Sequence, residues 1–152
     1  MTTQKMIRKS RFISVEIAIK TNFDSDAFVK WFEAQDEYVD NQSSEEAKWY
    51  IYFAPIPYKD ANTTIMNLCE MIKNLPDEVS EAWEKAEHRE FYAGYEVGDT
   101  PHFFPEHIEL ETLKACVSIG AGIGFCLYPA SPTNEHGLHP GAYEINQTQT
   151  IC

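Results

Sequence analysis

Apolar and polar side chains alternate along residues 12–19, with Ile13, Val15, Ile17 and Ile19 on one face. This period of two predicts a half-buried β-strand whose isoleucine and valine side chains face the core. In residues 121–128, Ile123, Phe125 and Leu127 alternate with glycines and Cys126 in the same way. Similar runs predict two more strands, over residues 48–54 and 89–97.

Between these strands, apolar residues recur every three or four positions, which predicts amphipathic helices. The four helices are expected over residues 22–35, 62–74, 76–87 and 108–119. In the first, Phe28, Trp31 and Phe32 make one apolar stripe, and in the third the stripe is Val79, Ala82, Trp83 and Ala86. In the last, the expected core group is Ile108, Thr112, Leu113, Cys116 and Val117.

These elements follow one another in the order βαβααβαβ, which predicts the α/β (α+β) class. We expect a single-layer, mainly antiparallel sheet of four or five strands, packed by helices. The polar stretch 36–46 is expected to be a solvated loop before the second strand. Residues 1–130 are predicted to form one α/β domain, and residues 131–152, which hold no lysine or arginine, an irregular C-terminal arm.

Charge is distributed unevenly along the chain. The sequence has 24 acidic and 12 basic residues and a formal net charge of −12, yet residues 1–20 contain five basic residues and one acidic residue. The acidic remainder repels nucleic acid and anionic lipid and accelerates encounters with cationic partners. We therefore expect no direct nucleic-acid binding and no membrane binding.

Two acidic segments are candidate contact surfaces for a basic protein. In residues 76–87 the carboxylates lie opposite the apolar stripe of the predicted helix: Asp77, Glu78, Glu81, Glu84 and Glu87. The polar stretch contributes Asp36, Glu37, Asp40, Glu45 and Glu46. Because a charged rim speeds association but does not by itself hold a complex together, aromatic anchors are expected beside it. The candidates are Tyr50, Tyr52 and Tyr58 near the polar stretch and Tyr92 and Tyr95 near the helix.

The common signatures of catalysis and of cofactor binding do not occur in the sequence. The chain has no G-x-S-x-G, no G-x-x-x-x-G-K-[ST] and no H-E-x-x-H. The glycine run at residues 120–124 opens a strand, whereas a dinucleotide-binding loop follows a strand and opens a helix. His136 and His139 lack the spaced cysteine or carboxylate partners of a metal site. We expect no cofactor, no metal and no enzymatic activity.

Cysteine usage and the lack of targeting segments predict a location. Cys69, Cys116 and Cys126 fall in apolar segments and are expected to be reduced core residues. The first eleven residues lack the apolar stretch of a signal peptide, and no run of about 18 apolar residues occurs. Both observations favour the cytoplasm.

Several motifs in the second half of the chain resemble a family of small bacterial α/β domains. They are Leu75-Pro76, Trp83, Ala86, Arg89-Glu90-Phe91, Gly94 to Gly98, Leu113, Gly120-Ala121 and Phe125 to Tyr128. The likeness covers about residues 68–130, and the family includes immunity proteins of polymorphic toxins, among them toxins of contact-dependent growth inhibition. The resemblance implies a cytoplasmic domain that neutralises a cognate toxin.

The expected function is therefore that of an immunity protein whose acidic surface binds a basic toxin, and a nuclease is the favoured kind of toxin because nucleases must hold phosphate backbones. Two alternatives stay open from the sequence. One is a small-molecule-binding or enzyme domain with a site near His102, His107 and Tyr95. The other is an acidic nucleic-acid mimic that blocks a DNA-binding protein.

Overall fold

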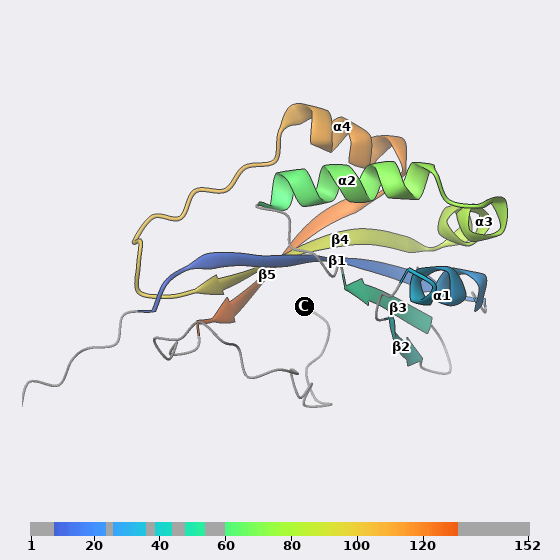
Figure 1. The fold of residues 1–152 in the computed structure, drawn as a ribbon, viewed down its shortest axis with the longest axis horizontal. Helices are drawn as coiled ribbons and strands as arrows, with labels where there is room; N and C mark the ends of the chain where they lie inside the picture. Colours follow the sequence, from blue (N-terminus) through green and yellow to red (C-terminus); the bar gives the residue numbers. More distant parts are fainter. Residues whose placement is uncertain (1–7, 24–25, 36–38, 44–47, 54–59, 131–152) are drawn as a thin grey trace, which may run out of the picture.

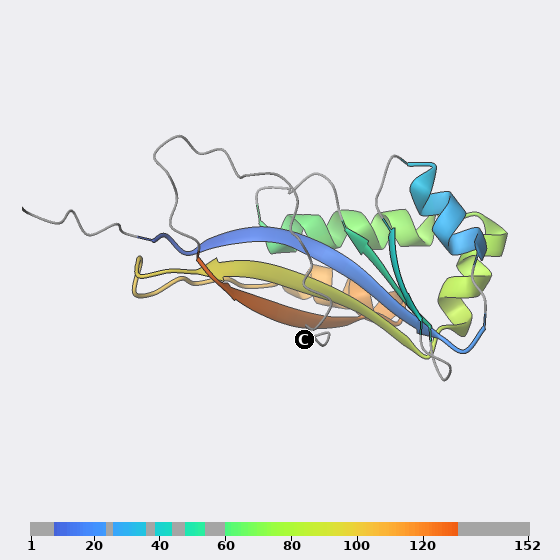
Figure 2. The same cartoon turned by 90° about the horizontal axis from the view of Figure 1, so that it is seen from below.

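The computed structural model describes residues 8–23, 26–35, 39–43, 48–53 and 60–130; for 39–43 and 48–53 it describes the backbone. A five-stranded sheet has the order β2-β3-β1-β4-β5, with helices α2, α3 and α4 over one of its faces (Figures 1 and 2). Three of the four strand pairings are antiparallel, and β4 and β5 are parallel. The predicted fold class is therefore confirmed: helices pack on a single-layer, mainly antiparallel sheet.

The core forms where the central strand β1 (Arg11–Thr21) and its neighbour β4 (His88–Val97) face the helices. Val15, Ile17 and Ile19 of β1 are fully buried, as is Phe91 of β4. Each fully buried side chain of this size contributes about 1.5–3 kcal/mol of transfer free energy, so this row stabilises the whole sheet. Phe28 and Phe32 of α1 (Asp26–Glu33) join the same cluster, with ring centroids 4.5 Å apart.

Helices α2 (Ala61–Lys73) and α3 (Asp77–Lys85) bury the stripes that their periodicity predicts. In α2 the buried residues include Ile65, Leu68, Cys69 and Ile72. The helix begins at Asp60, whose carboxylate accepts a hydrogen bond of 2.7 Å from the amide of Thr63 and so satisfies one of the free donors of the first turn. In α3, Val79, Ala82 and Trp83 are buried, as is Ala86 at the C-cap.

The second half of the sheet is a strand–helix–strand unit. After β4, the chain crosses over through α4 (Leu110–Ser118) to β5 (Gly122–Pro129), which lies parallel to β4 at the edge of the sheet. Gly120 ends α4 with a φ of 68°, a conformation that glycine adopts without steric cost. Helix α4 packs against α2 and touches β5.

Two local expectations about the first half of the sheet were wrong. The polar stretch predicted as a loop contains a strand, β2 (Val39–Ser43), which pairs with β3 (Lys48–Phe53) and forms the other edge of the sheet. An edge strand needs backbone hydrogen bonds but no apolar face, so its sequence carries no alternation signal. In β1, a register shift between Phe12 and Ser14 brings Phe12, not Ile13, into the core cluster.

The expectations for α4 and β5 were wrong in a different way. Thr112 and Cys116 are buried as predicted, but Leu113 and Val117 are 42% and 79% exposed. Phe125 and Leu127 of β5 share the helix-side face with Ala93 and Tyr95, yet they are 56% and 67% exposed. The helices thus cover the centre of the sheet and leave the helix-side face of β5 open.

The opposite face of the sheet carries a carboxylate at its centre. Glu16 lies between Val15 and Ile17, which face the helices, and its backbone neighbours are Phe53 on β3 and Tyr92 on β4. Burial raises the pKa of the Glu16 carboxyl above its ordinary value of 4.5. The folded state therefore binds this proton more tightly than the unfolded chain does.

We expect Glu16→Gln to raise the free energy of unfolding at pH 7. The cost of the buried carboxylate is absent below the ordinary pKa, builds up as the pH rises to the raised pKa, and is constant above it. Urea titrations from pH 4 to pH 8 will measure the difference between the two proteins, which is predicted to shrink toward pH 4. Glu33→Gln, at an exposed position of α1, is the matched control; a Glu16→Gln protein no more stable than this control at pH 7 contradicts the prediction.

Candidate protein-binding surface

The acidic face predicted for residues 76–87 is built on α3. Asp77, Glu78, Glu81 and Glu84 are all exposed, and they point away from the buried side of the helix. Asp77 and Glu78 occupy the first turn, where the positive end of the helix dipole favours carboxylates. The fifth residue, Glu87, was wrongly placed on the helix: the chain is already extended at Ala86, and the amide of Glu87 donates to the carbonyl of Lys20.

Nearby lysines compensate part of this charge. Lys85 donates to the carboxylate of Glu81 one turn away, and this hydrogen bond lowers the pKa of the exposed Glu81 carboxyl. The Lys20 ammonium lies 4.0 Å from the Glu87 carboxylate. Asp77, Glu78 and Glu84 have no ion pair with any described residue, and two of these three carboxylates lie in the first turn of α3.

A groove runs between α1 and the first turn of α3. The groove is wide open to solvent, has a volume of about 390 Å³ and is lined by Ala27, Lys30, Trp31, Pro76, Asp77, Glu78 and Val79. Trp31 is half-buried, and its ring packs edge-on against the ring of Phe32, with centroids 4.9 Å apart. A groove lined by an indole and two carboxylates suits a long basic side chain. An indole ring attracts a cation and the methylene groups that carry it, and carboxylates pair with its charge.

Trp31 is a functional candidate that the helical periodicity did not single out. It was assigned to the core stripe of its helix with Phe28 and Phe32, and these two are fully buried. At about 100° per residue, Trp31 lies at the edge of the stripe, 60° from Phe28 and 100° from Phe32. This angular position indicates a half-exposed ring, because residues at the edge of an apolar stripe are covered less completely than those at its centre.

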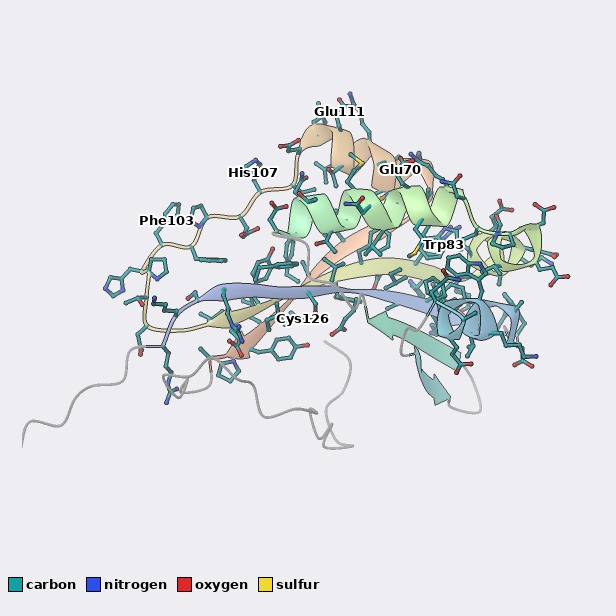
Figure 3. All side chains as sticks on the ribbon, viewed as in Figure 1. Glu70, Trp83, Phe103, His107, Glu111 and Cys126 are labelled. Atoms are coloured by element: carbon teal, nitrogen blue, oxygen red, sulfur yellow. The ribbon has the colours of Figure 1, made fainter. Side chains whose placement is uncertain are left out.

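Buried contacts hold α3 in place. The indole nitrogen of Trp83 donates a 2.9 Å hydrogen bond to the carbonyl of Ile119, at the end of α4, and its ring stacks on Phe91 with centroids 6.3 Å apart. Figure 3 labels Trp83, which lies between α3 and the sheet. At the C-terminal end of α3, the Arg89 guanidinium donates a 3.4 Å hydrogen bond to the carbonyl oxygen of Glu84. It also packs closely on Gly120, where an added Cβ atom would lie 3.0 Å from the guanidinium. The acidic face is therefore presented by a helix fixed to the core.

The second predicted acidic segment falls mostly outside the described residues. Asp36, Glu37, Glu45, Glu46 and Tyr58 lie there, as does the expected C-terminal arm. Asp40 belongs to β2, and Tyr50 and Tyr52 belong to β3, strands described by their backbone alone. Tyr92 lies on the helix-free face of the sheet, where its hydroxyl donates to Glu90.

The alternative site around Tyr95 is arranged differently from the expectation. Tyr95 is buried, its hydroxyl is 3.4 Å from the Glu106 carboxylate, and its ring meets Phe104 and Phe125. Burial, together with the Glu106 charge, raises the pKa of the Tyr95 hydroxyl. His102 and His107 are exposed, and no hydrogen bond or ring contact within the described part of the chain joins either to Tyr95.

The three described cysteines are buried and form no disulfide. The sulfur atoms of Cys69 on α2 and Cys116 on α4 are 3.7 Å apart. The hydrogen bond with Cys116 raises the pKa of the Cys69 thiol, and burial raises it further, so the thiol stays protonated at neutral pH. Among the residues described, no three His, Cys, Asp or Glu side chains gather in a way that would hold a metal ion.

Comparisons of the chain with protein-family models, with curated proteins and with solved structures found no match. Across the described ranges, no helix combines the length and the apolar character needed to cross a bilayer. What the structure defines is an α+β domain that presents an acidic helix and an adjoining groove with an aromatic wall.

Trp83→Phe tests the attachment of α3. The substitution removes the indole donor, so the Ile119 carbonyl loses its hydrogen bond from Trp83, and the smaller ring leaves a void. We expect a loss of about 1–3 kcal/mol in the free energy of unfolding. Chemical denaturation will measure it. Trp31→Phe, at a half-exposed ring with no such hydrogen bond in the described region, is the control and is expected to cost less. Equal losses for the two variants would contradict this view of the attachment.

Proposed function

We propose that the protein is an inhibitor that binds a basic protein toxin through the surface formed by α1 and α3, as an immunity protein does. The observation that carries the proposal is the groove in which Trp31 adjoins the carboxylates of Asp77 and Glu78. It combines an apolar anchor position with two carboxylates that form no ion pair with a described residue, and protein interfaces depend on both apolar anchors and charge complementarity.

The kind of partner is inferred from charge. Nuclease toxins carry basic surfaces because they hold phosphate backbones, and a chain of net charge −12 attracts such surfaces over long range. An inhibitor that covers this surface also excludes the nucleic acid. The resemblance of residues 68–130 to immunity domains favours a toxin as the partner and the cytoplasm as the place of action.

In the proposed contact, the residues of the groove have distinct tasks. Asp77 and Glu78 are expected to steer association and to pair with an arginine or lysine of the partner. Trp31 is expected to slow dissociation by stacking on that side chain. Lys30 also lines the groove, and it is expected to exclude partners that place a second cation against α1, because the two cations would repel each other.

Asp77→Asn/Glu78→Gln tests the steering. The probe is a basic toxin candidate encoded beside the gene of this chain, purified as a catalytically inactive variant. Removing two charges while preserving shape is expected to slow association about threefold to tenfold and to flatten its salt dependence. Stopped-flow mixing at several ionic strengths measures both. The control Glu109→Gln/Glu111→Gln removes two exposed carboxylates at the start of α4 and is expected to change little. Equal effects of the two pairs would place the contact elsewhere.

Trp31→Ala tests the anchor. A central aromatic residue of an interface typically contributes about 2 kcal/mol or more, so dissociation is expected to be at least about thirtyfold faster, with little change in the association rate. Surface plasmon resonance separates the two rates, and thermal unfolding verifies that the variant is folded. A growth assay in cells expressing the active toxin gives the biological readout: protection is expected to fail with Trp31→Ala. Unimpaired protection and an unchanged dissociation rate would refute the anchor.

A further inference from the structure

One edge of the sheet has the features of an interface. β5 ends the strand order, and among the described residues no strand pairs with its outer side. Residues 122–129 include no charged side chain. Soluble proteins usually protect an exposed edge with charges, bulges or a covering segment, because its free amide and carbonyl groups otherwise pair with another strand. The opposite edge, β2, carries the polar sequence Val-Asp-Asn-Gln-Ser.

Apolar side chains flank this edge on the helix side. Phe125 and Leu127 project from β5, and α4 adds a stripe at positions i, i+3 and i+7 consisting of Leu110, Leu113 and Val117. The stripe is distinct from the buried side of α4, where Cys116 faces α2. It is also distinct from the charged side, on which Glu111 pairs with Lys114 and points away from the sheet in Figure 3. Helix α4 contacts β5, so the stripe and the strand lie on neighbouring elements of the fold.

The exposed area is of the size that a dimer requires. With large side chains presenting roughly 150–200 Å² each when fully exposed, these five expose on the order of 500 Å². A standard interface buries about 800 Å² per partner, and about 65% of a homodimer interface is apolar, which is again about 500 Å². The largest apolar patch on a typical monomer measures about 300–600 Å² and is often functional, so a patch of this size marks a candidate contact surface.

We propose that β5 and α4 form the contact with a second copy of this chain. Antiparallel pairing of two β5 strands about a twofold axis gives a partner strand to each outer edge, with which no described strand pairs, and it brings the two α4 stripes together in the layer above. The surface is self-complementary because it carries no uncompensated charge on β5 or on the apolar stripe. A basic toxin finds no carboxylate among these residues, so this surface serves a different partner from the acidic groove.

The proposed contact does not depend on the proposed inhibitor function. The α3 helix and the C-terminal end of β5 lie at opposite ends of the sheet in Figure 1, so a dimer leaves both grooves open. The two contacts also differ in their response to salt. Screening weakens the attraction between an acidic groove and a basic toxin, but it relieves the repulsion between two chains of net charge −12 and so strengthens the dimer.

Sedimentation equilibrium of the full chain tests the dimer. It covers roughly 1–100 µM protein, since the dimer fraction depends on protomer concentration. We expect a species of twice the 17.4 kDa chain mass, favoured by raising the salt concentration. A species of 17.4 kDa throughout this range overturns the proposal, and it is also the result expected if residues 131–152 cover the β5 edge within one chain.

Two variants locate the contact. Leu127→Lys and Val117→Lys each place a cation in the twofold-related patch and are expected to raise the dimer dissociation constant at least about tenfold. Asn67→Lys and Ser118→Lys, at exposed positions of α2 and of the polar side of α4, are the controls and are expected to leave it within about twofold. Circular dichroism verifies folding. A dimer unaffected by both patch variants, or weakened equally by the controls, overturns the assignment.

Discussion

The structure depends on the burial of the apolar row that β1 and β4 present to the helices. Val15, Ile17 and Phe91 are fully buried there, beneath helices that are themselves short. Helices of nine to thirteen residues have little stability of their own, so α2, α3 and α4 persist because the sheet gives their apolar stripes a surface to cover. Each exposed feature of the molecule is positioned by this contact.

At α3, this contact produces a fixed acidic face. Trp83 ties the helix to Ile119 and to Phe91, so the carboxylates on its outer side are held on a rigid support, next to the wall that Trp31 forms on α1. At β5 the same covering is incomplete, because α4 leaves the strand's Phe125 and Leu127 exposed. The surface of α1 and α3 thus presents charge with an aromatic wall, and the β5 edge presents apolar side chains and an outer side with which no described strand pairs. The first suits a cationic partner, and the second suits an identical chain.

The sequence predicted those features that follow from local periodicity. The stripes of α2 and α3 repeat every three to four residues, so the spacing of apolar positions was enough to assign Ile65, Leu68, Val79 and Trp83 to the core. Periodicity states which side of an element is apolar, but not whether another element covers it. Leu113, Val117, Phe125 and Leu127 were therefore expected in the core and are exposed. The groove could not be predicted at all, because it joins residues about 45 positions apart along the chain.

The central claim is that a basic protein is held against α1 and the first turn of α3. Hydrogen exchange followed by mass spectrometry, with and without the inactive toxin, tests it most directly. The account predicts slower amide exchange on binding in residues 26–35 and 76–85, with unchanged exchange in residues 122–129. Slower exchange confined to α4 and β5, with α1 and α3 unaffected, would contradict it.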